Sequence, residues 1–172
     1  MLMLDTPRLL IRPLEAGDAP FILQLLNEPS WLKNIGDKGV RSIADAEHYI
    51  RTGPSQMLAT YGFGSRLLRL KASGEAIGMC GLIKRDSLPE PDLGFALLPA
   101  FWGQGYAREA AEATLTDGTE RLGIRRVLAI CNPDNLASSK LLEALGFVLQ
   151  GSHQITPEAQ LLKLYARDAK AV

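Results

Sequence analysis

Residues that build metal sites and disulfide frameworks are scarce in this sequence, which holds only two cysteines and two histidines among 172 residues. Cys80 and Cys131 lie in apolar runs and form no Cys-x-x-Cys pair, which argues against a zinc site and a disulfide scaffold. His48 and His153 are far apart in the chain. We therefore expect reduced thiols and no bound metal ion.

A net charge is also missing, because 19 Lys and Arg residues balance 19 Asp and Glu residues. The bulk charge thus gives no support to binding of nucleic acid or of a membrane surface. No apolar run approaches the length of a membrane span, and the opening MLMLDTPRLLIRP lacks the apolar core of a signal peptide. The sequence predicts a cytoplasmic protein, with no nucleic-acid or membrane partner.

What is present is typical of one globular domain, here residues 1–172, with 47% hydrophobic and 22% charged residues. Either a monomer or a homodimer is compatible with this composition. Apolar periodicity and turn residues predict strands at residues 8–12, 65–71, 76–84, 92–98, 127–131 and 160–166. Helices are predicted to begin at Asp18 and at Ser42 and to span residues 106–122 and 135–145. Residues 27–39 and 52–64 are predicted loops, and the second loop is expected to be mobile.

This order of elements predicts an α+β fold with a mixed sheet. Residues 76–84 follow residues 65–71 through a short turn, which indicates antiparallel pairing. Residues 127–131, VLAIC, form a continuous apolar run after the helix at residues 106–122. A strand, a helix and a second buried strand indicate one parallel crossover.

Residues 92–110, DLGFALLPAFWGQGYAREA, join a strand to a helix through a loop with almost no side chains. Gly103 and Gly105 can adopt positive φ and let a ligand approach the backbone. The free N–H groups of the next helical turn then point at that ligand, with the helix dipole behind them. This junction suits a pyrophosphate, although two glycines before a helix are also ordinary turn chemistry.

The segment WGQGYAREA resembles motif A of the GCN5-related N-acetyltransferase (GNAT) superfamily, Gln/Arg-x-x-Gly-x-Gly/Ala, whose loop amides hold the pyrophosphate of acetyl-coenzyme A (acetyl-CoA). Gly105 and Ala107 fill its last two positions, and Trp102 departs from the first. An aromatic residue at this position, followed by Gly-x-Gly-x-Ala-x-Glu-Ala, resembles the motif of the RimJ/RimL branch, the ribosomal-protein N-terminal acetyltransferases. TPRLLIRPL, IGMCGL and NPDNLASSKLLEALGF extend the resemblance over nearly the whole chain.

The resemblance implies a mostly antiparallel, splayed sheet flanked by helices, with acetyl-CoA as co-substrate and an amine as acceptor. It places the thioester beside the backbone of three strand residues, one of which supplies the oxyanion donor. The residues that it assigns to coenzyme binding are Phe95, Ala96, Leu97, Trp102, Gly103, Gln104, Gly105, Tyr106, Ala107, Asn135 and Lys140. Core packing for Phe95 and Leu97, a helix cap for Asn135 and a solvated side chain for Lys140 are the structural alternatives.

Two residues are the catalytic candidates. The resemblance implies that Ser138, on the first turn of its helix, delivers a proton to the departing thiolate and that Asp92 serves as the base through water. Local hydrogen bonding for Ser138 and a strand-edge position for Asp92 are the competing interpretations. Glu109, in the first turn of the motif helix, is expected to stabilise the helix dipole.

The leading hypothesis is an N-acetyltransferase for protein or peptide α-amines, with a small-molecule amine as the alternative acceptor. A non-catalytic acyl-CoA-binding module is the second hypothesis. A nucleotide-binding regulator ranks last, because the Walker Lys-Ser/Thr pair is missing. The resemblance implies that the acceptor lies against residues 29–40, 52–64 and 149–157, which carry Trp31, Tyr61, Phe63 and His153 but no cluster of carboxylates. A polycationic acceptor is therefore disfavoured.

Overall fold

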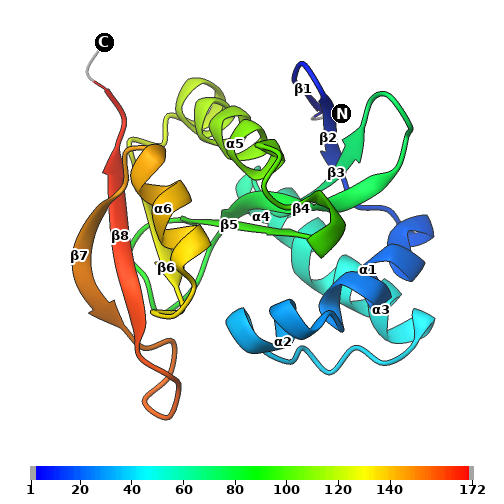
Figure 1. Ribbon diagram of the computed structural model, residues 1–172, viewed down its shortest axis with the longest axis horizontal. Helices are drawn as coiled ribbons and strands as arrows, with labels where there is room; N and C mark the ends of the chain where they lie inside the picture. Colours follow the sequence, from blue (N-terminus) through cyan, green and yellow to red (C-terminus); the bar gives the residue numbers. More distant parts are fainter. Residues whose placement is uncertain (1–2, 171–172) are drawn as a thin grey trace.

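The computed structural model describes residues 3–170 (Figure 1). Its strands are β1 (Leu4–Asp5), β2 (Leu9–Pro13), β3 (Arg66–Leu70), β4 (Ala76–Ile83), β5 (Asp92–Leu97), β6 (Arg126–Cys131), β7 (Val148–His153) and β8 (Leu162–Asp168). Its α-helices are α1 (Ala19–Leu26), α2 (Pro29–Asn34), α3 (Ile43–Ile50), α4 (Gln56–Tyr61), α5 (Tyr106–Leu122) and α6 (Leu136–Ala144).

All eight strands belong to one sheet, in the order β1-β2-β3-β4-β5-β6-β8-β7. Every neighbouring pair is antiparallel except β5 and β6, which are parallel and joined through α5. This confirms the predicted α+β class, the antiparallel hairpin of β3 and β4, and the parallel crossover. Figure 1 shows β6, β8 and β7 turned away from β3, β4 and β5, so the sheet is splayed.

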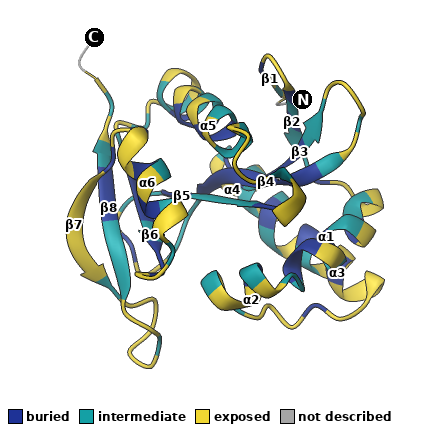
Figure 2. Ribbon diagram, viewed as in Figure 1, coloured by how far each residue is buried: buried dark blue, intermediate teal, exposed yellow. Residues whose placement is uncertain are grey.

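The two faces of the sheet carry separate layers of helices. In Figure 1, α5 lies on one face and α1, α2 and α3 lie on the other. Alternation along β3 assigns Leu68 to the core under α5 and Leu67 to the core under α1 and α3. Figure 2 shows that buried residues concentrate in the strands between the layers, whereas β7 is almost wholly exposed.

Two expected loops are helical, which corrects the sequence-based prediction. Residues 29–34 form α2, in which Pro29 occupies the first turn, where its missing N–H costs no hydrogen bond. The expected mobile segment at 52–64 contains a π-helical turn (Arg51–Ser55) that continues into α4. Pro54 is buried in that turn, so tertiary packing outweighs its usual effect as a helix breaker. β7 also occupies part of the expected acceptor segment at 149–157.

Candidate active site

The sheet opens where β5 leaves β6. The register pairs these strands only at Asp92 and Leu128, at the beginning of β5. Beyond this point β5 stays paired with β4 through Leu97 and separates from β6. One edge of β5 is therefore left without a strand partner over most of its length, as the resemblance implied.

Backbone groups of β5 point into this opening at alternate residues. Leu98 N donates a hydrogen bond to Ile77 O of β4 at 2.9 Å. Because the ladder groups of an antiparallel strand alternate in direction, the N–H groups of Phe95 and Leu97 point away from β4, whereas that of Ala96 points toward it. An extended ligand arm in the opening thus has two amides of β5 available.

The glycine loop follows at the end of β5. Gly103 and Gly105 have φ angles of 70° and 82°, which confirms the predicted positive φ at both positions. The first intrahelical bond of α5 runs from Glu109 N to Gly105 O. Within residues 3–170, the N–H groups of residues 103–108 have no acceptor. Six consecutive amides are therefore free at the positive end of the α5 dipole, which suits an anion.

Trp102 connects the loop to the strand. Its indole Nε1 donates to Leu97 O at 2.9 Å, and the residue is 54% exposed. Gln104 points away from the opening, since its Nε2 donates to Ala100 O at 3.1 Å. The aromatic departure from motif A thus has a structural use, because the indole holds the end of β5 against the glycine loop.

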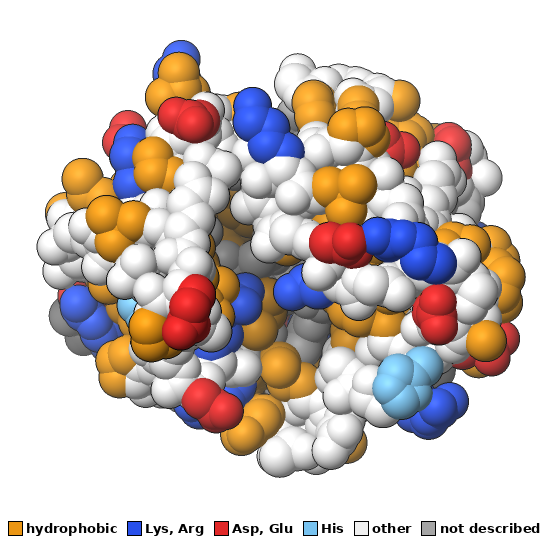
Figure 3. Space-filling view, turned by 90° about the horizontal axis from the view of Figure 1, so that it is seen from below, with side chains coloured by type: hydrophobic (Ala, Val, Ile, Leu, Met, Phe, Trp, Pro, Cys, Tyr) orange, Lys and Arg blue, Asp and Glu red, His pale blue; other side chains and the backbone are white. Residues whose placement is uncertain are grey.

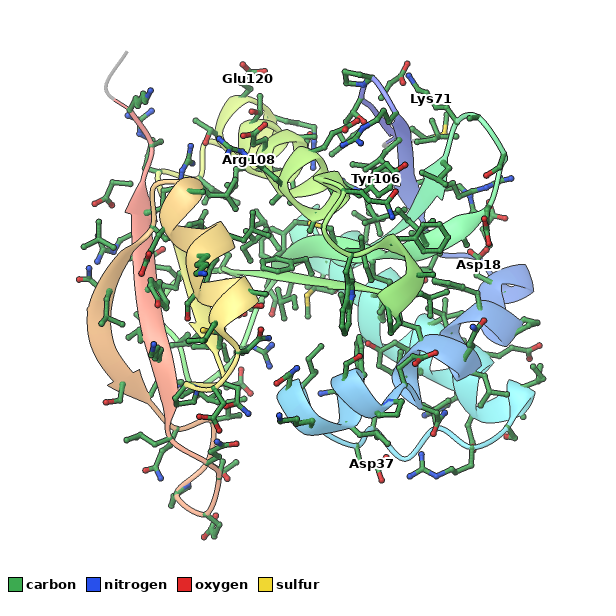
Figure 4. The ribbon with its side chains drawn as sticks, in the orientation of Figure 1. Asp18, Asp37, Lys71, Tyr106, Arg108 and Glu120 are labelled. Carbon is green, nitrogen blue, oxygen red and sulfur yellow. The ribbon has the colours of Figure 1, made fainter. Side chains whose placement is uncertain are left out.

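Arg8, which the sequence analysis did not single out, supports the loop from the bend that precedes β2. Its Nη1 donates to Gln104 O at 2.8 Å, and its guanidinium lies 4.3 Å from the centre of the Tyr106 ring. Figure 4 shows Tyr106 at the end of α5 that faces the β1 and β2 side of the molecule. Because these residues are about a hundred positions apart, only the fold brings them together.

Glu109 completes this support. It accepts hydrogen bonds from Thr6 Oγ1 at 2.7 Å, from Arg8 N at 2.8 Å and from Arg8 Nε at 2.7 Å. Partial burial alone would raise the pKa of Glu109, but the bonds from Thr6 and Arg8 outweigh it and lower that pKa. Glu109 therefore does more than face the helix dipole, because it ties the first strands to α5.

Across the opening, α6 and its N-cap residue supply three predicted site residues. Asn135 Oδ1 accepts a hydrogen bond from Ser138 N at 3.2 Å, which confirms the helix-cap interpretation of Asn135. The hydroxyl of Ser138 makes no hydrogen bond within residues 3–170, so it is free to meet a ligand. Lys140 is exposed on the same helix.

One cavity of about 650 Å³ runs along the opening, a volume that suits a small-molecule site. Figure 3 shows the hollow from below, with Lys and Arg side chains at its rim. Gln104 and Lys140 do not line it. The other predicted site residues do: Asp92, Phe95, Ala96, Leu97, Trp102, Gly103, Gly105, Tyr106, Ala107, Asn135 and Ser138.

Asp92 is the one carboxylate among the residues that line this cavity. It is 1% exposed, and one of its oxygens accepts a hydrogen bond from Arg85 Nε at 3.0 Å. Burial raises the pKa of Asp92, and the guanidinium of Arg85 opposes that rise. A carboxylate in this setting has a stronger affinity for a proton than an exposed aspartate.

We call the end of the cavity around Asp92 and Arg85, where the acceptor is expected, the acceptor end. Its residues match the sequence prediction only in part. Trp31 lines it as expected. Tyr61, Phe63 and His153 do not line it. The rings of Tyr61 and Phe63 stack with their centroids 5.6 Å apart, and His153 Nε2 lies 3.0 Å from Ser87 Oγ. Lys38, Tyr49 and Arg85 line this end as well, and no pattern in the sequence identified them.

Acetyl-CoA fits these residues on structural grounds. The six free amides at residues 103–108 suit its pyrophosphate, and the open edge of β5 suits its amide-bearing arm.

The described residues 3–170 contain no helix long and apolar enough to cross a membrane. Within the same range, no three His, Cys, Asp or Glu side chains are grouped to hold a metal ion.

Comparison with known proteins gives the same assignment. Residues 8–148 match the family model of the acetyltransferase (GNAT) domain. The N-acetyltransferase p20 of Bacillus licheniformis, described as uncharacterized, is 29% identical over 150 residues, which are 86% of this chain and 83% of that protein.

Solved structures share the fold over nearly the whole chain. An acetyltransferase from Agrobacterium tumefaciens superimposes with a TM-score of 0.84 at 26% identity, covering 98% of this chain and 95% of that one. RimL, a ribosomal L7/L12 alpha-N-protein acetyltransferase solved with coenzyme A, has a TM-score of 0.79 at 20% identity, covering 97% and 98%. The chain therefore belongs to the GNAT family and is an acetyl-CoA-dependent N-acetyltransferase.

Proposed function

We propose that the acceptor is an α-amine, most simply the N-terminus of a protein or peptide, and that the acetyl group passes to it directly in a ternary complex. The observation that carries this proposal is the single carboxylate in the cavity. Among the described residues that line the cavity, Asp92 is the single carboxylate that can act as a base, and none is a histidine. A site with one buried, paired base suits an amine that needs little help to lose its proton.

The pKa values of the two kinds of protein amine decide between them. An α-amine has a pKa near ~8, so roughly a tenth of it is neutral at pH 7, whereas a lysine ε-amine has a pKa near ~10.4 and is almost wholly charged. The raised pKa of Asp92 improves its power as a base, but its ion pair with Arg85 limits that gain. The α-amine is therefore the better match.

In the proposed reaction, the neutral amine nitrogen attacks the thioester carbonyl, and the C–S bond breaks after the tetrahedral intermediate forms. An N–H of Phe95 or Leu97 polarises the carbonyl oxygen. Asp92 takes the amine proton through water, and Ser138 delivers a proton to the thiolate. Support comes from the amide directions in β5 and from the position of Asp92 and Ser138 on the wall of one cavity.

A ribosomal-protein substrate is a narrower form of this proposal. The aromatic Trp102 at the first position of motif A favours the RimJ/RimL branch, and RimL shares the fold. A small-molecule amine is the second candidate acceptor, because the cavity encloses Asp92 and Trp31 among apolar walls that a compact ligand could fill.

Release of the coenzyme thiol from acetyl-CoA tests the proposal. Three acceptor groups are compared: peptides with a free N-terminus and blocked lysines, peptides with a blocked N-terminus and free lysines, and small primary amines. We expect release with the first group. Release only with small amines would replace the peptide by a small-molecule acceptor, and binding of acetyl-CoA without release would contradict α-amine acetylation.

A further inference from the structure

The acceptor end of the cavity carries an excess of positive charge. Lys38, Arg85 and Asp92 line this end, so two cations meet one carboxylate. Arg85 donates to Asp92 only through Nε, and within residues 3–170 neither of its Nη atoms has a hydrogen-bond acceptor. Lys38 forms no ion pair with any described residue. Cationic donors are therefore left over after the internal pairing is complete.

Lys38 reaches this end from the loop between α2 and α3. The residue as a whole is exposed, but loss of hydration lowers the pKa of its ammonium, and repulsion by Arg85 lowers it further. The two cations are thus close enough to repel each other. An anion placed between them would relieve the repulsion and satisfy both sets of donors.

A neutral donor that lines the same cavity is also unsatisfied. Trp31 is 6% exposed, and its indole Nε1 has no hydrogen-bond partner within the described residues. A buried N–H without a partner is costly, and it suits a site in which a ligand supplies the acceptor. Tyr49 adds a hydroxyl near Arg85, whose positive charge opposes the rise in the pKa of that phenol caused by burial.

The phosphates of the coenzyme do not explain these donors. Asp92 begins β5 and the glycine loop follows its end, so the two sites are separated by the six residues of that strand. At about 3.3 Å per residue, this separation is roughly 17 Å. A pyrophosphate on the amides of residues 103–108 therefore lies too far away to pair with Arg85.

Building on the proposed α-amine acceptor, we propose that the acceptor carries an anionic group near its amine, a carboxylate or a phosphate, which binds Lys38, Arg85 and Trp31 Nε1. Asp92, which accepts from Arg85 Nε through one oxygen, faces the amine through water in this arrangement. The acceptor end then binds the two groups of one ligand separately. Asp92 faces the amine, and Lys38, Arg85 and Trp31 bind the anion.

Equilibrium binding to the protein saturated with coenzyme A tests this inference without any turnover. Three pairs of acceptors each contrast an anionic member with a neutral analogue: Asp-Ala-Ala amide and Asn-Ala-Ala amide, alanine and alaninamide, and phosphoethanolamine and ethanolamine. Charge-assisted hydrogen bonds predict a Kd about tenfold lower for the anionic member of at least one pair. The preferred pair identifies the source as a side-chain carboxylate, an α-carboxylate or a phosphate.

Lys38→Met is the test variant and Lys33→Met is its matched control, because Lys33 is an exposed lysine of α2 that does not line the cavity. The preference for the anion should disappear in Lys38→Met and persist in Lys33→Met, with acetyl-CoA affinity unchanged in both as a check of folding. Equal Kd values within every pair, or a full preference in Lys38→Met, would overturn the inference.

Acetyl transfer to the same acceptors is measured in parallel, so that the two proposals fail separately. Selective binding of an anionic acceptor without transfer would support the anion site and contradict the proposed acetylation of α-amines. Transfer to both members of every pair at equal rates, with equal Kd values, would support that acetylation and contradict the anion site.

Discussion

The two ends of the cavity are built from different parts of the chain and in different ways. At the glycine-loop end, the groups that face a ligand are backbone amides of residues 103–108 and of β5. At the acceptor end, they are side chains of Trp31, Lys38, Arg85 and Asp92. A backbone cradle serves one coenzyme whatever the acceptor is, whereas side chains can change with it. Under the two proposals above, coenzyme binding and acceptor choice fall in separate regions of the cavity.

The largest expected effect breaks the backbone end. Gly105→Val should weaken acetyl-CoA binding by about a hundredfold or more, because the residue has a φ of 82° and a branched side chain would occupy the approach of the pyrophosphate. Calorimetric titration measures the affinity.

Gly123→Val is the matched control for this variant. Gly123 ends the same helix with a φ of 68° and has no atom within 4 Å of an added Cβ, so it carries similar backbone strain far from the loop. Both variants should lose thermal stability, but only Gly105→Val should lose affinity. Unchanged affinity in a folded Gly105→Val protein would contradict the role of the loop.

An intermediate effect concerns chemistry at the junction of the two ends. Ser138→Ala should lower kcat about tenfold while leaving acetyl-CoA affinity nearly intact, because a serine is a weak acid whose help is modest. The loss should shrink with acyl donors whose thiol is more acidic. Ser139→Ala is the control, since Ser139 is buried against Cys131 and does not line the cavity. A loss of affinity alone would make Ser138 a binding residue.

The smallest effect sharpens the comparison by loosening the support of the loop. Glu109→Gln should lower the free energy of unfolding by about 1 kcal/mol at pH 7 and weaken acetyl-CoA binding a few-fold, because Arg8 loses its ion pair. Since the folded pKa of Glu109 is lowered, its stabilisation is present above the ordinary glutamate pKa of ~4.3 and is lost as the pH falls through the folded pKa.

Denaturant unfolding at several pH values measures this difference. The control is Glu112→Gln, because Glu112 pairs with Arg108 at an exposed place on the same helix, where an ion pair contributes little. A stability difference between Glu109→Gln and the unaltered protein that persists at low pH would contradict the assignment.

The contrast between the two ends also explains what could be predicted from the sequence. Glycines before a helix and alternation along a strand are local patterns, so the positive φ angles of Gly103 and Gly105 and the strand β5 were predicted from them. Contacts such as Arg8 with Glu109, or Arg85 with Asp92, depend on which strands and helices meet, and no local pattern encodes them. α2 was missed because its stability comes from burying Trp31 rather than from helix propensity.

The central claim is that backbone amides bind the coenzyme while Asp92, paired with Arg85, is the base for the acceptor amine. Its most direct test uses a peptide with both a free N-terminus and a free lysine. Its kcat/KM is followed against pH, and the acetylated amine is located by mass spectrometry. The account predicts acetylation of the α-amine, with a kcat/KM that rises with pH and levels off above the α-amine pKa of ~8. Asp92→Asn should lower kcat/KM little for the α-amine but much for any transfer to the ε-amine. Preferential acetylation of the ε-amine, or of neither amine, would contradict it.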